Sequence, residues 1–197
     1  MSYRWLKTFF ASCSLAVLLS ACQPAPQFLN NNITASNLRT DIALTSQDGA
    51  PVLINAPQKG KVSVVFFGYT QCPDVCPTTL GKMKLVMQKL GADADKVRVI
   101  FVTVDPERDK PEVLKAYVDA FDSGFTAAYT DPATTQKVAK QFQIIFQKEG
   151  TGLSYLVNHT ANLYLLDENG RTVVSAPYEA KPESIAHDIK QILAQYQ

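Results

Sequence analysis

The 197-residue sequence has almost no net charge, only four cysteines and only two histidines. Its 19 basic and 18 acidic residues leave a formal charge of +1, which excludes a strongly basic nucleic-acid-binding protein. Four cysteines are too few for a small scaffold held together by disulfides. Mixed charge together with ten Phe and eight Tyr argues against an intrinsically disordered chain. The length suits one domain of ordinary size with a hydrophobic core.

The start of the chain has the pattern of an export signal. A short basic segment precedes an apolar run at residues 9–19, which is too short to cross a bilayer as a helix, since that takes about 20 residues. The tetrapeptide Leu19-Ser20-Ala21-Cys22 resembles the lipobox of bacterial lipoproteins. That resemblance implies cleavage before Cys22 and lipidation of its sulfur, with the acyl chains holding the protein at a membrane.

We therefore expect three segments. Residues 1–21 are a lipoprotein signal peptide, residues 22–36 are a flexible tether rich in Pro, Gln and Asn, and residues 37–197 form the folded domain. The mature protein is expected in the cell envelope, exported and lipid-anchored to a membrane facing the periplasm. No internal repeat is visible, and no later run is apolar enough to span a membrane.

Apolar patterning in the folded domain alternates between strands and helices. Residues 62–68 form a nearly continuous apolar run, which predicts a central strand buried on both faces, and residues 97–104 predict a second. Further strands are expected at residues 38–45, 51–54, 161–166 and 172–176, and helices from Pro77, from near Pro111, over 132–142 and over 182–196. This order predicts an α/β domain with a thioredoxin-like fold, in which a central mixed sheet is flanked by helices.

Helical periodicity also predicts which helix residues face the core. The expected inward-facing residues are Leu80, Met83, Met87 and Leu90 in the first helix, Val113, Leu114, Tyr117 and Phe121 in the second, and Ile185, Ile189, Ile192 and Leu193 in the last.

Cys72 and Cys76 lie in a proline-flanked loop at the exit of the first buried strand. If Pro77 is the first helical residue, Cys76 is the N-cap, where unpaired N–H groups and the helix dipole favour a thiolate. A structural disulfide is one interpretation, although it would close a very short loop and gain little entropy. A redox-active dithiol is another, although three residues separate the cysteines where the usual motif has two. A metal site is the third interpretation, although two thiolates alone are one ligand short of a good site for a soft metal ion.

The two histidines differ in their surroundings. His187 lies on the far side of its helix from the apolar stripe, so we expect it to be solvated. His159 precedes a late strand, and in a thioredoxin-like fold the loop entering that strand packs against the cysteine loop. Two thiolates and one imidazole favour Cu(I) and can also hold Cu(II). Structural zinc normally takes four protein ligands, and no fourth Cys or His is available, so copper is expected.

Three stretches, GYTQCPDVCPTTL, VDPERDKPEVLKAYV and VNHTANLYLLDENG, resemble the Sco/SenC family of copper-binding assembly factors for cytochrome c oxidase. The resemblance runs from about residue 37 to the C-terminus. It implies a thioredoxin-like fold that binds one copper ion through Cys72, Cys76 and His159. It also implies that the protein delivers copper to the dinuclear copper centre of oxidase subunit II, or reduces the cysteines of that centre. Residues 105–109 match a family segment, for which we expect a structural or partner-surface role only.

The leading hypothesis is therefore a metallochaperone that passes copper to a protein acceptor. Its other expected partners are copper chaperones or thiol reductants, and no binding to nucleic acid is expected. The alternative is a thiol-disulfide oxidoreductase in which Cys72 and Cys76 cycle between dithiol and disulfide. The two uses are linked, because copper binding requires reduced thiols. A peroxiredoxin-like peroxidase is a third class, but Tyr69 replaces the Thr that this class usually has three residues before its reactive cysteine.

Overall fold

The computed structural model describes residues 25–152 and 154–196. The expected signal peptide and Cys22 lie outside these residues. Within the described part of the chain, no helix is both long enough and apolar enough to cross a bilayer.

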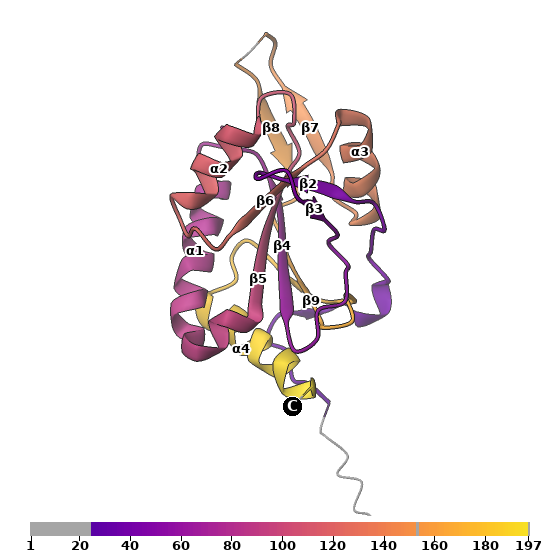
Figure 1. The fold of residues 1–197 in the computed structure, drawn as a ribbon, viewed down its shortest axis with the longest axis vertical. Helices are drawn as coiled ribbons and strands as arrows, with labels where there is room; N and C mark the ends of the chain where they lie inside the picture. The colour runs from indigo at the N-terminus through magenta and orange to yellow at the C-terminus, as the bar shows by residue number, and fades with distance from the viewer. Residues whose placement is uncertain (1–24, 153, 197) are drawn as a thin grey trace, which may run out of the picture.

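A mixed eight-stranded sheet forms the centre of the fold (Figure 1). Its strands are β1 (Asn31–Asn32), β2 (Leu44–Ser46), β3 (Pro51–Val52), β4 (Val62–Gly68), β5 (Val97–Thr103), β6 (Thr126–Tyr129), β9 (Leu163–Leu166) and β10 (Thr172–Ala176). The strand order is β1-β10-β9-β4-β5-β6-β2-β3. Strands β4, β5 and β6 are parallel, and the other neighbouring pairs are antiparallel. Two further strands, β7 (Phe146–Glu149) and β8 (Leu156–His159), form a separate antiparallel hairpin.

Among the described residues, four α-helices cover the sheet: α1 (Val75–Leu90), α2 (Pro111–Asp119), α3 (Pro132–Gln141) and α4 (Pro182–Leu193). Short 3₁₀ segments accompany them: η1 (Thr34–Ser36), η2 (Gly91–Lys96) and η3 (Ala194–Tyr196). Helices α1, α2 and α4 lie on one side and α3 on the other (Figure 1). Because β4, β5 and β6 follow one another in the same direction across the sheet, right-handed crossovers put α1 and α2 on the same face. The predicted thioredoxin-like α/β fold is confirmed.

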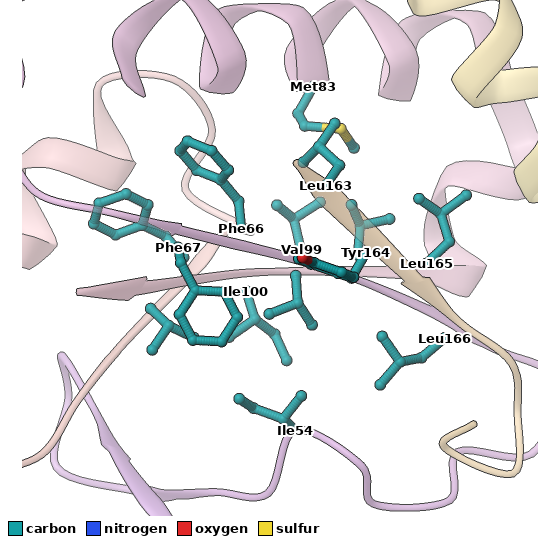
Figure 2. Close-up of a cluster of buried hydrophobic side chains, with 14 of the residues drawn as sticks. Ile54, Phe66, Phe67, Met83, Val99, Ile100, Leu163, Tyr164, Leu165 and Leu166 are labelled. Atoms are coloured by element: carbon teal, nitrogen blue, oxygen red, sulfur yellow. The ribbon is translucent and has the colours of Figure 1, made fainter. Parts of the chain in front are cut away.

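The core lies on both faces of β4, every residue of which is buried. Phe66 lies on the same side of the sheet as Met83 of α1, whereas Phe67 and Ile54 lie on the opposite side (Figure 2). The prediction of a strand buried on both faces is therefore confirmed. Its consequence for the site is rigidity, because the loop that follows β4 starts from a strand that is buried along its whole length.

The predicted boundaries of several helices and strands were wrong, and so was the prediction that Val113 faces the core. Helix α1 begins at Val75, before the proline, because proline is tolerated within a first turn where its missing N–H needs no partner. Val113 is 41% exposed, since Leu114 and Val118, four residues apart, form the inward face of α2. The strand predicted from residue 38 begins only at Leu44. The preceding chain bonds to a side chain rather than to a neighbouring strand, as where the Thr40 N–H donates to Asn55.

Part of the segment expected to be a flexible tether is bound to the body. Strand β1 pairs with β10, and the Ile33 N–H donates to the Val173 carbonyl at 2.9 Å. The Asp188 carboxylate of α4, which is fully buried, accepts the N–H groups of Leu29 at 2.7 Å and Asn30 at 3.0 Å. Any flexible segment after Cys22 therefore has to end before these bonds.

Candidate metal centre

Cys72, Cys76 and His159 come together at the carboxyl end of β4. Their ligand atoms all lie within 4.8 Å of one another. The two cysteines come from the loop after β4 and the first turn of α1, while the histidine is the last residue of β8. Both cysteines are free, with no disulfide between them.

The N-terminus of α1 acts on Cys72 rather than on Cys76, contrary to our expectation. Asp74 is the N-cap, so Cys76 is already inside the first turn, and its backbone N–H donates to the Cys72 sulfur at 3.4 Å. The pKa of Cys72 is lowered to about 3, chiefly because the Cys76 thiol donates a hydrogen bond to its sulfur. Contacts with His159 and backbone N–H groups add to this, while burial opposes it. Cys72 is therefore a thiolate at neutral pH.

Cys76 is the protonated member of the pair. The pKa of its thiol is raised, because the Cys72 thiolate accepts its proton in a hydrogen bond and because the side chain is fully buried. Its sulfur lies against the backbone of Gly68, where a Cβ atom would come within 2.7 Å of it. The two sulfurs thus share one proton, and the half-buried Cys72 carries the charge.

The His159 imidazole is oriented by its backbone surroundings. The His159 Nδ1 atom donates to the Thr160 carbonyl oxygen at 2.9 Å, so in the neutral ring Nε2 carries the free lone pair. That Nε2 atom lies 3.3 Å from the Cys76 sulfur. The rings of Phe66 and Tyr69 pack edge-on against the imidazole, with centroids 6.1 and 6.0 Å away. Tautomer and ring direction are therefore both set for ligation through Nε2.

These donors fit a soft, low-coordinate metal ion. Two sulfurs and one imidazole nitrogen form a set that suits copper better than a hard cation. A cavity of about 360 Å³ opens beside the site and is lined by Cys72 and His159 together with Pro73, Val75 and Leu156, among others. Cys76 is not part of that lining and lies behind it. An incoming ligand would therefore reach Cys72 and His159 first.

The segment after β5 contributes more to the site than its sequence indicated. Its Asp109 carboxylate accepts the Thr70 N–H at 3.0 Å and the hydroxyls of Thr70 and Thr103. It is almost completely buried, and burial raises the pKa of the carboxyl. These bonds hold the start of the cysteine loop. The sequence did contain one indication of this role for Asp109. It follows the second of two adjacent parallel strands, and residues that follow such strands emerge at the same edge of the sheet.

The other residues that the sequence singled out lie elsewhere. His187 is half-buried on α4, where its Nδ1 atom is 3.1 Å from Asp188, and it is not part of the Cys72, Cys76 and His159 group. Cys22, the expected lipidation site, lies outside the described residues. The sequence patterns also gave no indication of β7 and β8, so His159 was expected in a loop entering the strand that is now β9.

Comparison with known proteins gives consistent matches. The family model described as SCO1/SenC matches residues 30–194. An SCO2-like protein of Rickettsia typhi is 32% identical over 165 residues, which is 81% of each chain. The structure of Bradyrhizobium japonicum ScoI with copper bound is 40% identical and has a TM-score of 0.72, covering 79% of this chain and 99% of that one. A SCO1/SenC family lipoprotein from Bacillus anthracis is 29% identical with a TM-score of 0.69, covering 79% and 95%.

Proposed function

The chain belongs to the SCO1/SenC family, and on this premise we propose that it is a copper-binding assembly factor for cytochrome c oxidase. Copper is its cargo, held by Cys72, Cys76 and His159. One observation carries the proposal: two sulfurs and a pre-oriented imidazole nitrogen lie within 4.8 Å of one another. The similarity to ScoI of Bradyrhizobium japonicum, which was solved with copper bound, supports the choice of metal.

The two cysteines take different parts in loading. Cys72 is a thiolate beside the cavity, so it offers the first charged sulfur to an arriving ion. Cys76 is a thiol, and its proton has to leave when its sulfur binds. His159 presents Nε2 without needing to lose a proton in the neutral ring. Three protein ligands leave a coordination position open at the cavity, through which an acceptor can take copper by ligand exchange.

We infer that the acceptor is the dinuclear copper centre of oxidase subunit II, and membership of the SCO1/SenC family supports this choice. Lipidation of Cys22 would hold the domain at a membrane on the periplasmic side, within reach of a membrane-bound acceptor. The family includes a bacterial lipoprotein and mitochondrial proteins, which supports a membrane-associated site of action. The bonds between the N-terminal segment and α4 would keep the body close to such an anchor.

A thiol-disulfide oxidoreductase is the second candidate, favoured by the asymmetry of the two cysteines. The Cys72 thiolate would attack a partner's disulfide and form a mixed disulfide, and the partner's other sulfur would leave and take up a proton. The Cys76 sulfur, after losing its proton, would then attack Cys72 and release the partner as a dithiol. A half-exposed thiolate followed by a buried thiol suits this order.

Copper titration of the reduced, soluble domain tests the proposal. Wild type should bind one copper ion with sulfur charge-transfer absorption, and Cys72→Ser, Cys76→Ser and His159→Ala should each weaken binding. His187→Ala is the matched histidine control and should bind as wild type does. Unchanged copper affinity in His159→Ala would show that the ligand assignment is wrong. If His159→Ala loses copper, keeps disulfide exchange and still supports oxidase assembly in cells, the reductase function is the correct one.

A further inference from the structure

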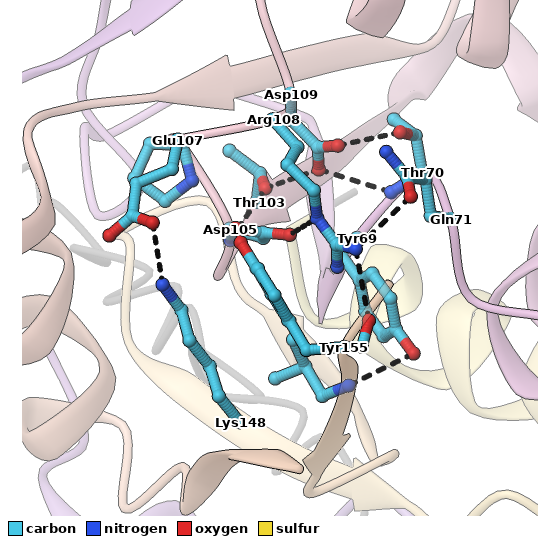
Figure 3. Close-up of polar contacts among 12 residues, drawn as sticks. Tyr69, Thr70, Gln71, Thr103, Asp105, Glu107, Arg108, Asp109, Lys148 and Tyr155 are labelled. Atoms are coloured by element: carbon cyan, nitrogen blue, oxygen red, sulfur yellow. Dashed lines mark hydrogen bonds and ion pairs between the residues drawn. The ribbon is translucent and has the colours of Figure 1, made fainter. Parts of the chain in front are cut away.

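The Arg108 side chain bonds to both halves of the metal site at once. Its Nη1 atom donates to the Gln71 side chain at 3.1 Å and to the Tyr155 carbonyl oxygen at 2.9 Å (Figure 3). Gln71 immediately precedes Cys72, and Tyr155 immediately precedes β8, the strand that ends at His159. A single guanidinium therefore links the cysteine loop to the base of the histidine strand.

Arg108 is itself held in place on several sides. Its Nε atom donates to Asp105, and the two side chains are 9% and 0% exposed. The guanidinium carbon lies 3.6 Å above the Tyr155 ring, and the Tyr155 hydroxyl donates to Asp105 at 2.6 Å (Figure 3). A planar guanidinium can meet a carboxylate, a carbonyl and an aromatic face together, which an ammonium cannot.

The histidine strand needs such a link because it is not part of the main sheet. Among the residues that the structure describes, β7 and β8 pair only with each other, so no backbone ladder to β4 sets the distance between His159 and the cysteines. A second link comes from Tyr69, whose hydroxyl accepts the Val157 N–H at 3.1 Å. The position of β8 relative to the cysteine loop therefore depends on side-chain bonds at its base and its middle.

We propose that Arg108 is a positioning residue for His159. By bonding to Gln71 and Tyr155 together, it keeps the imidazole Nε2 atom within reach of the Cys76 sulfur. The inference rests on the proposed function, because it takes His159 as a copper ligand. Arg108 is not itself a ligand, and its effect on copper passes through the histidine.

Arg108→Lys tests the positioning role, because lysine keeps the positive charge but lacks the planar guanidinium that bonds to several acceptors at once. Changing a residue that orients a metal ligand typically weakens metal binding about 10- to 100-fold, and we expect a loss in that range. In the His159→Ala background the same substitution should cause no further loss. In the metal-free protein, nuclear Overhauser contacts between the His159 and Tyr69 rings should weaken. Glu107→Gln is the matched control: it removes the exposed ion pair between the residue before Arg108 and Lys148 of β7, leaves the bonds to Gln71 and Tyr155 in place, and should keep wild-type copper affinity.

The outcomes separate the inference from the proposed function. Equal losses of affinity with and without His159, or unchanged ring contacts in the metal-free protein, would overturn the positioning role. If His159→Ala alone leaves copper affinity unchanged, the ligand assignment fails instead. Should Arg108→Lys not fold, Tyr155→Phe removes only the hydroxyl bond to Asp105, and should give a smaller loss with the same dependence on His159. A loss that persists without His159 would contradict the proposal here too.

Discussion

The Nε2 atom of His159 lies 3.3 Å from the Sγ atom of Cys76, a residue 83 positions earlier in the chain. The contact joins the β7–β8 hairpin to the first turn of α1. A metal ion bound at this contact would tie together two elements that share no sheet ladder.

Copper should therefore stabilise the fold, and His159 should be needed for much of that effect. An ion that binds only the folded state at 100 times its dissociation constant adds about 2.7 kcal/mol to the free energy of unfolding. Thermal unfolding of the reduced domain with and without copper measures this gain. His159→Ala should have nearly wild-type stability without copper and a smaller gain with it. An equal gain in both proteins would contradict a ligand role for His159.

Cys72 should be alkylated at acidic pH, where an ordinary cysteine is inert. Its pKa of about 3 means that the thiolate predominates at pH 5, whereas a free cysteine with a pKa near 8.5 is almost wholly protonated. Iodoacetamide labelling from pH 4 to 9, followed by peptide mass spectrometry, should locate the label on Cys72 and spare Cys76. Cys76→Ala should slow labelling at pH 5, because it removes the thiol that donates to the Cys72 sulfur. An unchanged rate would exclude that hydrogen bond as the main cause.

Gly68→Ala should damage the site, whereas Gly81→Ala should not. A Cβ at Gly68 would lie 2.7 Å from the Cys76 sulfur and 2.8 Å from the Phe101 ring, so both side chains or the strand itself would have to move. We expect a loss of about 1–3 kcal/mol in stability and weaker copper binding. Gly81 lies within α1 with open space around it, so alanine there should add up to about 1 kcal/mol. Urea unfolding and copper titration compare the two, and wild-type copper affinity in Gly68→Ala would contradict the predicted crowding.

Asp109→Asn should change how stability depends on pH. Burial raises the pKa of Asp109 in the folded protein above its unfolded value near 3.9, so the folded state binds this proton more tightly. That contribution is fully present below about pH 3.9 and is lost as the pH rises through the folded-state pKa. Wild type should therefore lose stability relative to Asp109→Asn as the pH increases from 4. Urea unfolding of the metal-free, reduced proteins measures the difference, and parallel pH profiles would count against it.

Asp188→Ala should release the N-terminal segment from α4. The carboxylate accepts the backbone N–H groups of Leu29 and Asn30 and the Asn30 side-chain amide at 2.7 Å. Its removal should lower the free energy of unfolding by about 1–3 kcal/mol and speed proteolysis near residue 30. Gln191→Ala is the control, because it removes only an exposed acceptor of the Gln27 N–H. Equal cleavage rates in wild type and Asp188→Ala would show that the carboxylate does not hold the segment.

Much of the architecture was predictable because its signals are local. The apolar run of β4 is buried on both faces as its composition indicated, and the helix that begins at Pro182 buries Ile185, Ile189 and Ile192 as its periodicity indicated. The family resemblance, carried by the residues around the cysteine loop, is confirmed. Patterns of this kind report on a residue and its near neighbours, and they need no knowledge of the rest of the chain.

The features that the sequence did not predict mostly depend on contacts between residues distant in sequence. Nothing near residue 30 indicates a buried carboxylate in α4, and nothing near residue 108 indicates that its guanidinium will meet Gln71 and Tyr155 together. The β7–β8 hairpin was missed for a different reason: most of its residues are exposed, and its short strands carry little apolar alternation.

Residue chemistry together with the expected fold was enough to group two thiols and one imidazole as a soft metal set, because ligand preference belongs to the side chains and the fold brings their loops together. Which sulfur carries the negative charge could not be read from the sequence, and our assignment of the N-cap to Cys76 pointed to the wrong one. The location of the negative charge depends on where α1 begins, on the proton that Cys76 shares with Cys72, and on the deeper burial of the Cys76 sulfur. The charge on Cys72, the tautomer of His159 and the distance between His159 and Cys76 all depend on contacts of a few ångströms. Those contacts form only when β4, α1 and β8 have packed together.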